Sequence, residues 1–287
     1  MLISREPLHS GMRDRKAEEY FDGIAENYAL GEPEDPFARF ARCAFSFADD
    51  ITWHFIKKYI PTDKSIKILD AGAGEGFWAQ KLFELGYRNI TLLDISKGML
   101  EQAKKRFSSI DGPHISFIKS DIADMKEVAA MEFDFIFSQY DAVSLSMKPR
   151  ESVRELTRVA KPGSHIVLSM DTKFRRVPEL IEAGRIDDAE KLLKTNVSYD
   201  FEFPQYNLTW QELREHFEAC SLVVLEIVGA PVFMHQVNEK TLESLEKDLK
   251  MRNRLLKMEL DYCTDTSLVN FAGHIQIIGE KGNDSEF

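Results

Sequence analysis

The stretch "KILDAGAGEGFW" places three glycines on alternate positions directly after an apolar run. Gly72, Gly74 and Gly76 stand too close together for the interior of a helix or a strand. Glycine permits positive φ and lets another molecule approach the main chain closely. With Asp70 before the loop and Glu75 inside it, the local charge suits a ligand that carries positive charge. The spacing also differs from the G-x-G-x-x-G of dinucleotide-binding loops.

Three further runs end in polar groups. Asp94 ends "ITLLD", and its carboxylate can accept hydrogen bonds from both hydroxyls of a ribose. In "SDIADM", Asp121 can accept from an exocyclic adenine amine while the Ile122 N–H donates to a ring nitrogen. In "FSQYD", the carbonyl of Ser138 can face an ammonium group. Two apolar side chains are expected to sandwich the base, Ile95 and Met99. Together the four runs predict a site for an adenosine with a cationic amino acid attached.

These runs belong to a regular alternation of short β-rich stretches and helical patterns that begins near residue 65. Such alternation predicts an α/β fold, a doubly wound parallel sheet with helices on both faces. Ligands of such sheets bind beyond the carboxyl ends of the strands. Ser96 is predicted to cap a helix that follows Asp94. Thr209 and Glu212 are predicted to form a capping box. A single polar helix is predicted over 239–262, before a last strand "GHIQIIGEK".

The alternation divides the chain into five expected parts. They are an N-terminal helical cap or lid (1–64), the cofactor-binding core (65–171), an insertion that acts as a substrate lid (172–208), the rest of the core sheet (209–282) and a tail (283–287).

Composition narrows the function. The 37 basic and 48 acidic residues give a net charge of −11, a field that repels nucleic-acid backbones. Hydrophobic residues at 44% and charged residues at 30% are typical of a globular enzyme. The three cysteines are scattered and odd in number, which argues against a disulfide or zinc framework. We expect a cytoplasmic protein with no membrane span, no metal and no general affinity for nucleic acid.

With these motifs in view, the chain resembles class I S-adenosylmethionine-dependent methyltransferases. The resemblance is carried by "ILDAGAGEG", "LLDIS", "SDIADM", "FDFIFSQYD" and "VAKPGSHIVLSMD", and by "AGHIQIIGEK" for the last strand. It implies S-adenosyl-L-methionine as cofactor and a Rossmann-like sheet of seven strands, mostly parallel, whose antiparallel last strand lies between the fifth and the sixth. It also places Ala71, beside the glycine loop, among the cofactor-binding residues.

Near the start, "YFDGIAENYA" resembles the N-terminal segment of ubiquinone- and menaquinone-type methyltransferases. The resemblance implies a segment that folds over the cofactor, which would place Tyr20 or Tyr28 on it. The alternative is that both tyrosines are core residues of an ordinary helical cap.

Methyl transfer from a sulfonium is an in-line displacement that requires positioning more than a catalytic side chain. The candidates for positions beside the methyl group are Tyr140 and Asp141 after the fourth strand and His235 after the sixth. A histidine of near-neutral pKa is a plausible proton acceptor, although each candidate also has a structural interpretation. His274, inside the last strand, is expected to be structural.

The acceptor is expected to be a small organic molecule in an apolar pocket. Its candidate wall is a set of residues from the insertion and from "GAPVFMHQV": Tyr199, Phe201, Phe203, Tyr206, Phe233 and Met234. The same residues could simply pack the insertion onto the sheet. Two basic runs, "RR" at 175–176 and "KKR" at 104–106, are expected on solvated surfaces. The polar helical run near 242–262 is a candidate homodimer contact.

The favoured function is therefore transfer of a methyl group from S-adenosylmethionine to a small molecule. The alternatives are a methyltransferase that acts on RNA or protein, a non-catalytic S-adenosylmethionine-binding protein, and a nicotinamide oxidoreductase. The glycine spacing opposes the last.

Overall fold

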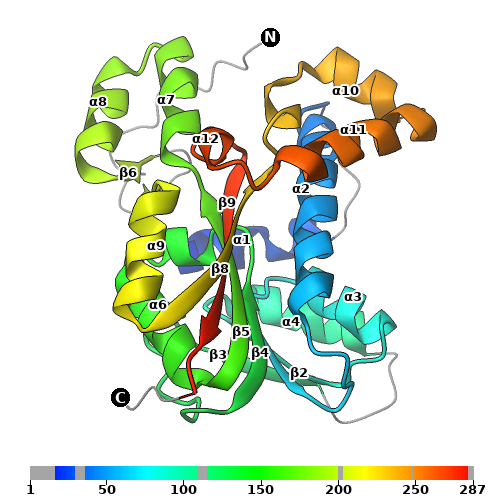
Figure 1. Ribbon diagram of the computed structural model, residues 1–287, viewed down its shortest axis with the longest axis vertical. Coiled ribbons are helices and arrows are strands. Elements are labelled where there is room, and N and C mark those ends of the chain that lie inside the picture. Colours follow the sequence, from blue (N-terminus) through cyan, green and yellow to red (C-terminus); the bar gives the residue numbers. More distant parts are fainter. Residues whose placement is uncertain (1–16, 30–35, 109–114, 200–202, 247, 284–287) are drawn as a thin grey trace.

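The computed structural model describes residues 17–29, 36–108, 115–199, 203–246 and 248–283. One seven-stranded sheet dominates it, in the order β3-β2-β1-β4-β5-β9-β8 (Figure 1). The bounds are β1 Lys67–Ala71, β2 Asn89–Asp94, β3 Ile115–Lys119, β4 Phe133–Ser138, β5 Ala160–Asp171, β8 Leu222–Ala230 and β9 His274–Lys281. The first five strands pair in parallel and β9 pairs antiparallel with both β5 and β8. The predicted doubly wound sheet, with its last strand between the fifth and the sixth, is confirmed.

Helices cover both faces of this sheet. One face carries α2 (Pro36–Tyr59), α3 (Phe77–Glu84), α4 (Lys97–Phe107) and α11 (Leu249–Tyr262), whose apolar side chains form one buried cluster with the strands. The other carries α5 (Ala142–Leu145), α6 (Pro149–Val159), α9 (Trp210–Ala219) and α12 (Thr266–Val269), which form a second cluster. Burying strands on both faces explains why β1 and β4 read as nearly continuous apolar runs.

Local capping fixes where the helices begin. The Ser96 side chain accepts from the Met99 N–H at the start of α4. Thr209 and Glu212 form a complete capping box at the start of α9. Both caps were predicted from the sequence. The single helix predicted over 239–262 was wrong, because the chain forms α10 (Glu239–Glu246) and then α11, for which the Asp248 side chain is a new N-cap.

The segment between β5 and α9 leaves the sheet at its carboxyl edge. It forms α7 (Lys173–Glu182), α8 (Ile186–Thr195) and the two-stranded β6 (Val197–Ser198) and β7 (Gln205–Tyr206). In Figure 1 this segment lies above the end of β5, across the sheet from α10 and α11. A short helix η2 (Met234–Gln236) follows β8 at the same end.

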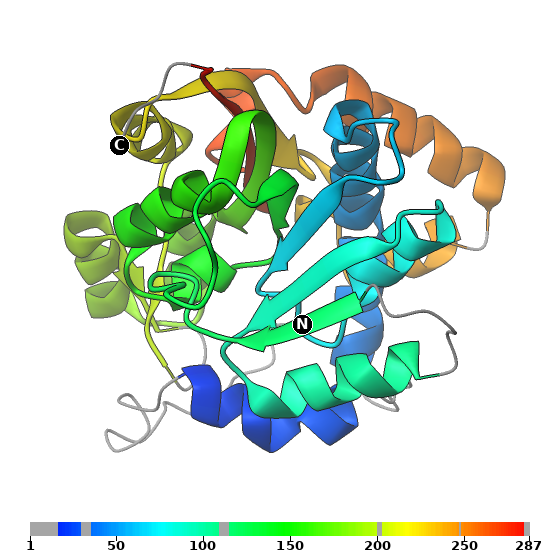
Figure 2. The same ribbon diagram turned by 90° about the horizontal axis from the view of Figure 1, so that it is seen from below.

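Helix α1 (Ala17–Ala29) lies along α4 (Figure 2). Gly98 permits this approach, since a Cβ there would lie 3.0 Å from that of Ala25. Asp22 accepts from the Gly98 N–H at 2.8 Å and from the Ser96 hydroxyl at 2.6 Å. The first described helix is thus attached to the start of α4, two residues beyond Asp94. No described helix is long and apolar enough to cross a membrane.

Candidate functional site

The glycine loop crosses from β1 to α3 with its main chain bare. Gly72, Gly74 and Gly76 all have positive φ, of 81°, 53° and 84°. A Cβ on Gly72 would lie 2.2 Å from that of Ala142, so this glycine is required by packing against α5. At Gly74, by contrast, no described atom lies within 4 Å of the position that a Cβ would take. The loop is therefore packed at its start and open at its middle.

Asp94 holds the open part of the loop. Its Oδ2 accepts from the Gly74 N–H at 2.8 Å and its Oδ1 from the Ser96 N–H at 2.8 Å. Burial raises the pKa of Asp94, and the bonds from Ser96 and Gly74 oppose that rise. Because a carboxylate oxygen has two lone pairs, each oxygen retains one acceptor position. The carboxylate is thus oriented at the end of β2, beside the bare glycine backbone.

Asp70 is a buried acid directly before the loop. It is 1% exposed, and among the described residues nothing donates to its Oδ2. Burial, and next the charge of Asp94, raise the pKa of Asp70 well above its usual value. A cation at this point would pair with an otherwise unsatisfied oxygen.

Glu75 does not contribute in the same way. Its carboxylate forms an ion pair with Arg106, and Arg106 also donates to the Glu75 carbonyl at 2.9 Å. The charge of Glu75, which was expected to suit a cationic ligand, is thus paired with Arg106. The prediction that Arg106 lies on a solvated surface was wrong, since its side chain is only 26% exposed. The pair joins α4 to the glycine loop.

The next strand end presents the predicted adenine-binding groups in one short turn. Asp121 accepts from the Ala123 N–H at 2.9 Å through its Oδ1, which fixes the plane of the carboxyl group. Ile122 and Met99 are buried and Ile95 is half-buried. Ser138, at the end of β4, is fully buried, and its hydroxyl contacts no partner in the described ranges.

Tyr140 and Asp141 follow β4 in consecutive left-handed conformations, with φ of 56° and 73°. Such strain in non-glycine residues costs of the order of 1–3 kcal/mol each and is concentrated at functional sites. It turns Tyr140 toward α2, where its hydroxyl donates to Asp49 and its ring stacks on Trp78 with centroids 6.0 Å apart.

Asp141 points the other way, to the first residue of β9. Its Oδ2 lies 3.2 Å from His274 Nε2, and its Oδ1 accepts from the Asp171 N–H at 2.6 Å. Burial opposes the charge of His274, but the charge and hydrogen bond of Asp141 outweigh it and raise the pKa of the histidine. His274 is 7% exposed and its ring lies 5.3 Å from that of Tyr140.

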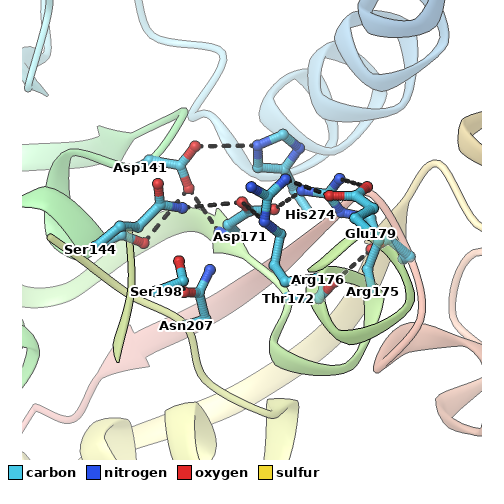
Figure 3. A network of polar contacts seen from close by, with 12 residues as sticks. Asp141, Ser144, Asp171, Thr172, Arg175, Arg176, Glu179, Ser198, Asn207 and His274 are labelled. Atoms are coloured by element: carbon cyan, nitrogen blue, oxygen red, sulfur yellow. Dashed lines mark hydrogen bonds and ion pairs between the residues drawn. The ribbon is translucent and has the colours of Figure 1, made fainter. Parts of the chain in front are cut away.

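Beside this pair lies what we call the charged cluster: Asp141, Asp171, Arg175, Arg176, Glu179 and His274 (Figure 3). Arg175 bonds both Asp171 and Glu179, and Arg176 donates to Glu179 at 2.5 Å. The two arginine side chains are only 18% and 17% exposed. The prediction that "RR" lies on a solvated surface was therefore wrong. Coulombic attraction to the arginines overcomes the effect of burial and lowers the pKa of Asp171 to about 2.

His235 lies in η2, near the same cluster. Burial, and next the charge of Arg175, lower its pKa to about 4. Its Nδ1 contacts no partner in the part of the chain that the structure describes. This lowered pKa differs from the near-neutral value expected of a histidine that acts as a proton acceptor.

Comparison with known proteins places this architecture in a family. A family model described as "Methyltransferase domain" matches residues 68–163, the segment from β1 to β5. Malonyl-[acyl-carrier protein] O-methyltransferase of Buchnera aphidicola is 34% identical over 127 residues, 44% of this chain and 47% of that protein. Residues 68–163 are thus identified as a methyltransferase domain of the class I S-adenosylmethionine-dependent type.

Other relatives differ in what their names say they methylate. The tRNA 5-carboxymethoxyuridine methyltransferase of Escherichia coli K12 is 23% identical over 94% of this chain and 97% of its own length. A solved Haloferax volcanii complex between the Trm112 methyltransferase activator and a putative methyltransferase has the same fold, with a TM-score of 0.62 and 17% identity over 95% of this chain and 100% of the other. The match spans less than half the length of the malonyl and of the Clavibacter sepedonicus demethylmenaquinone relatives.

His274, which the sequence suggested to be a structural residue, lies at the ligand edge of the sheet. An antiparallel strand begins where its parallel neighbour ends, so β9 starts at the carboxyl edge, with His274 paired to Asp171. The implied strand order therefore contained the signal, because it placed the first residue of the last strand at the ligand edge.

The predicted aromatic wall divides between two places. Phe203 is buried, and its ring contacts Tyr20 and Phe21 of α1 at 5.1 and 6.1 Å. Met234 and Phe233 instead pack with α2, α10 and α11. The side chain of Tyr28 and all of Phe201 lie outside the described residues. The insertion and the N-terminal helix thus meet through Phe203, at the carboxyl edge of the sheet.

Proposed function

We propose that this protein transfers a methyl group from S-adenosylmethionine to a small-molecule acceptor. The observation that carries the proposal is the bare Gly74 backbone, held by Asp94 and open where a Cβ would stand. Side chains are absent there because a ligand lies against the main chain. The unsatisfied oxygen of buried Asp70 supports a cationic amino acid end at the same edge.

The residues present fit the cofactor. Asp94 would hold the ribose hydroxyls, and Asp121 with the Ile122 N–H would hold the adenine edge between Ile95 and Met99. The amino acid end would lie along Gly72, Ala71 and the Ser138 carbonyl, toward Asp70. Tyr20 is the described candidate for a lid contact, since α1 is attached at Ser96 and Gly98. When bound, the cofactor supplies the electrophilic methyl group.

The chain's own contribution to transfer is to position the acceptor and to take its proton. Because the electron pair of the broken bond would stay on the sulfur of the cofactor, the chain need only hold the acceptor oxygen in line with the methyl group. The proton of a hydroxyl acceptor moves to the neutral imidazole of His274. Asp141, whose Oδ2 lies 3.2 Å from Nε2, stabilises the positive charge that results. Tyr140 and Trp78 form an aromatic wall on one side of this pair.

Calorimetry with S-adenosylhomocysteine tests the cofactor site directly. We expect binding by the unchanged protein and a loss of about 1–3 kcal/mol in Asp94→Ala, because the ribose hydroxyls lose their acceptor. Asp124→Ala, an exposed carboxylate on the neighbouring turn, is the matched control and should bind as the unchanged protein does. Equal affinity in both variants, or heat with NAD and none with S-adenosylhomocysteine, would remove the proposal. Formation of S-adenosylhomocysteine with a metabolite extract then tests turnover.

RNA is the second candidate acceptor. It is favoured by the Escherichia coli tRNA relative, which aligns with 94% of this chain. The net charge of −11 opposes it, because the field repels phosphates. Transfer of labelled methyl groups into precipitable tRNA, with none into small molecules, would establish this alternative.

A further inference from the structure

Two arginines of α7 share one exposed carboxylate. Arg175 Nη1 donates to Glu179 Oε1 at 2.7 Å, and Arg176 Nη1 donates to Glu179 Oε2 at 2.5 Å. Each oxygen of this carboxylate thus takes one arginine (Figure 3). The Glu179 side chain is 42% exposed, whereas both arginine side chains are less than half as exposed. A partly buried pair of cations is therefore covered by an acid that can move into solvent.

The second acid of this group cannot move in the same way. Asp171 is the last residue of β5, and its side chain is 8% exposed. It accepts from Arg175 and, at 2.9 Å, from the Gln205 amide of β7. Asp171 therefore balances one positive charge permanently. Glu179 balances the other from a place that is accessible from outside.

We propose that the methyl acceptor carries a carboxylate, and that this group replaces Glu179 on Arg175 and Arg176. The inference rests on the proposed function and names the class of its acceptor. Exchange of one carboxylate for another keeps the number of charged hydrogen bonds constant. A neutral acceptor that displaced Glu179 would instead leave two partly buried arginines with the single negative charge of Asp171, which is costly.

Two buried donors that lack acceptors in the described part of the chain, one on Arg175 itself and one just after β7, support a ligand at this place. Within the described residues, Arg175 Nε and Asn207 Nδ2 are buried and have no acceptor. Asn207 is itself fully buried, and its Oδ1 accepts from the Ser198 hydroxyl, so its amide nitrogen is the unsatisfied end. Buried polar groups without partners are uncommon, and a bound ligand is one of the explanations for them.

The arginines also lie beside the groups assigned to proton transfer. Asp171, which Arg175 bonds, donates its N–H to Asp141, and Asp141 contacts His274. An acceptor held by its carboxylate at the arginines is thereby placed next to this pair. The position suits substrates of limited length, such as short dicarboxylic or hydroxycarboxylic acids.

Malonate is a suitable probe because it is small and doubly charged, and it requires no knowledge of the acceptor. We expect Glu179→Gln to bind malonate about threefold to tenfold more tightly than the unchanged protein, since the competing carboxylate is gone. Glu182→Gln removes the same charge from an exposed position of the same helix and should leave the affinity unchanged. Equal gains in the two variants would mean a general charge effect and would overturn the proposal.

Arg176→Gln tests the opposite effect, a loss of malonate binding, and thermal unfolding checks that the variant folds. It should lose malonate binding while S-adenosylhomocysteine binding stays within about twofold of the unchanged protein. Malonate binding that persists in this variant would overturn the proposal, and so would tighter binding of inorganic phosphate than of malonate. If the unchanged protein does not bind S-adenosylhomocysteine, the proposed function itself is refuted. Failure of the carboxylate proposal and failure of the proposed function are therefore distinguishable.

Discussion

The glycine-loop end and the charged cluster lie along the same sheet edge but are built in different ways. At the glycine-loop end, Asp94 and Gly74 are joined by one hydrogen bond, and the partners of Asp94 are backbone N–H groups from 74 and 96. The charged cluster depends on side chains from β5, α7 and β9, together with the turn after β4. One end thus relies on main-chain N–H groups as partners and the other mainly on contacts between charged side chains.

This difference separates what is common to the family from what is particular to this chain. A cofactor shared by many enzymes can be held by backbone groups and a few acids, which many sequences can supply. An acceptor must be recognised by side chains, which each enzyme is free to change. The charged cluster, where Asp171 and His274 pair across neighbouring strands, is therefore the end that should decide the substrate.

Replacing His274, the proposed proton acceptor, should have the largest effect on catalysis. The effect should be confined to the charged cluster. We expect His274→Gln to lower kcat with a hydroxyl-bearing acceptor by about 10²–10⁴-fold, the usual contribution of a positioned acid or base. Binding of S-adenosylhomocysteine should change little, because His274 lies at the start of β9, against Asp141 and Tyr140. Steady-state kinetics and calorimetry on the same preparation measure the two quantities. Loss of cofactor binding along with kcat would show that the two ends are one unit.

The pH profile of the same reaction sharpens this prediction. The folded-state pKa of His274 is raised above 6.5, and only neutral imidazole can accept a proton. The rate should therefore rise with pH through a value above 6.5 and be low below it. Asp141→Asn removes the charge that raises the pKa, so the rising limb should move to lower pH. A limb that does not move would exclude His274 as the group that titrates.

Substitutions in the glycine loop should impair the glycine-loop end in two distinct ways, one through ligand affinity and one through stability. Gly74→Val places a side chain where the ligand lies, so we expect at least about a 100-fold loss of S-adenosylhomocysteine affinity, with about 1–2 kcal/mol of stability lost to the positive φ. Gly72→Ala should cost about 2–4 kcal/mol of stability, since its Cβ would clash with Ala142 at 2.2 Å. Urea unfolding and calorimetry separate the two effects. Similar stability losses in both variants would contradict an open loop at Gly74.

The same contrast explains which features were predictable from the sequence. The sheet, the N-cap Ser96 and the capping box at Thr209 follow from local patterns, and they were confirmed. The position of Asp94 at the end of β2 follows from the same patterns, but its bond from the Gly74 N–H, 20 positions away, depends on the pairing of β1 with β2.

The environment of Arg175 and Arg176 was not predictable in that way. A dipeptide "RR" carries no sign of burial, which here arises from Asp171 and Glu179 together with the fold of the insertion. The ion pair of Glu75 was likewise not predictable, since its partner Arg106 lies on α4, 31 positions away. Charge alone does not reveal whether a group faces a ligand or an ion-pair partner. Only the packing of distant elements decides it.

The smallest expected effect concerns the attachment of α1 to the glycine-loop end. Asp22 accepts from Gly98 N–H and Ser96 Oγ at the start of α4, where a helix N-terminus favours negative charge. Its pKa is lowered mainly by the Ser96 hydrogen bond, so the attachment is present at neutral pH and is lost as pH falls through that lowered value. Asp22→Asn should weaken S-adenosylhomocysteine binding by about twofold to fivefold, a modest effect because the pair is exposed. Glu26→Gln, on the same helix, is the control that should not change affinity. If both variants bind as the unchanged protein does, α1 is not a lid, and the glycine-loop end holds its ligand through the sheet edge alone.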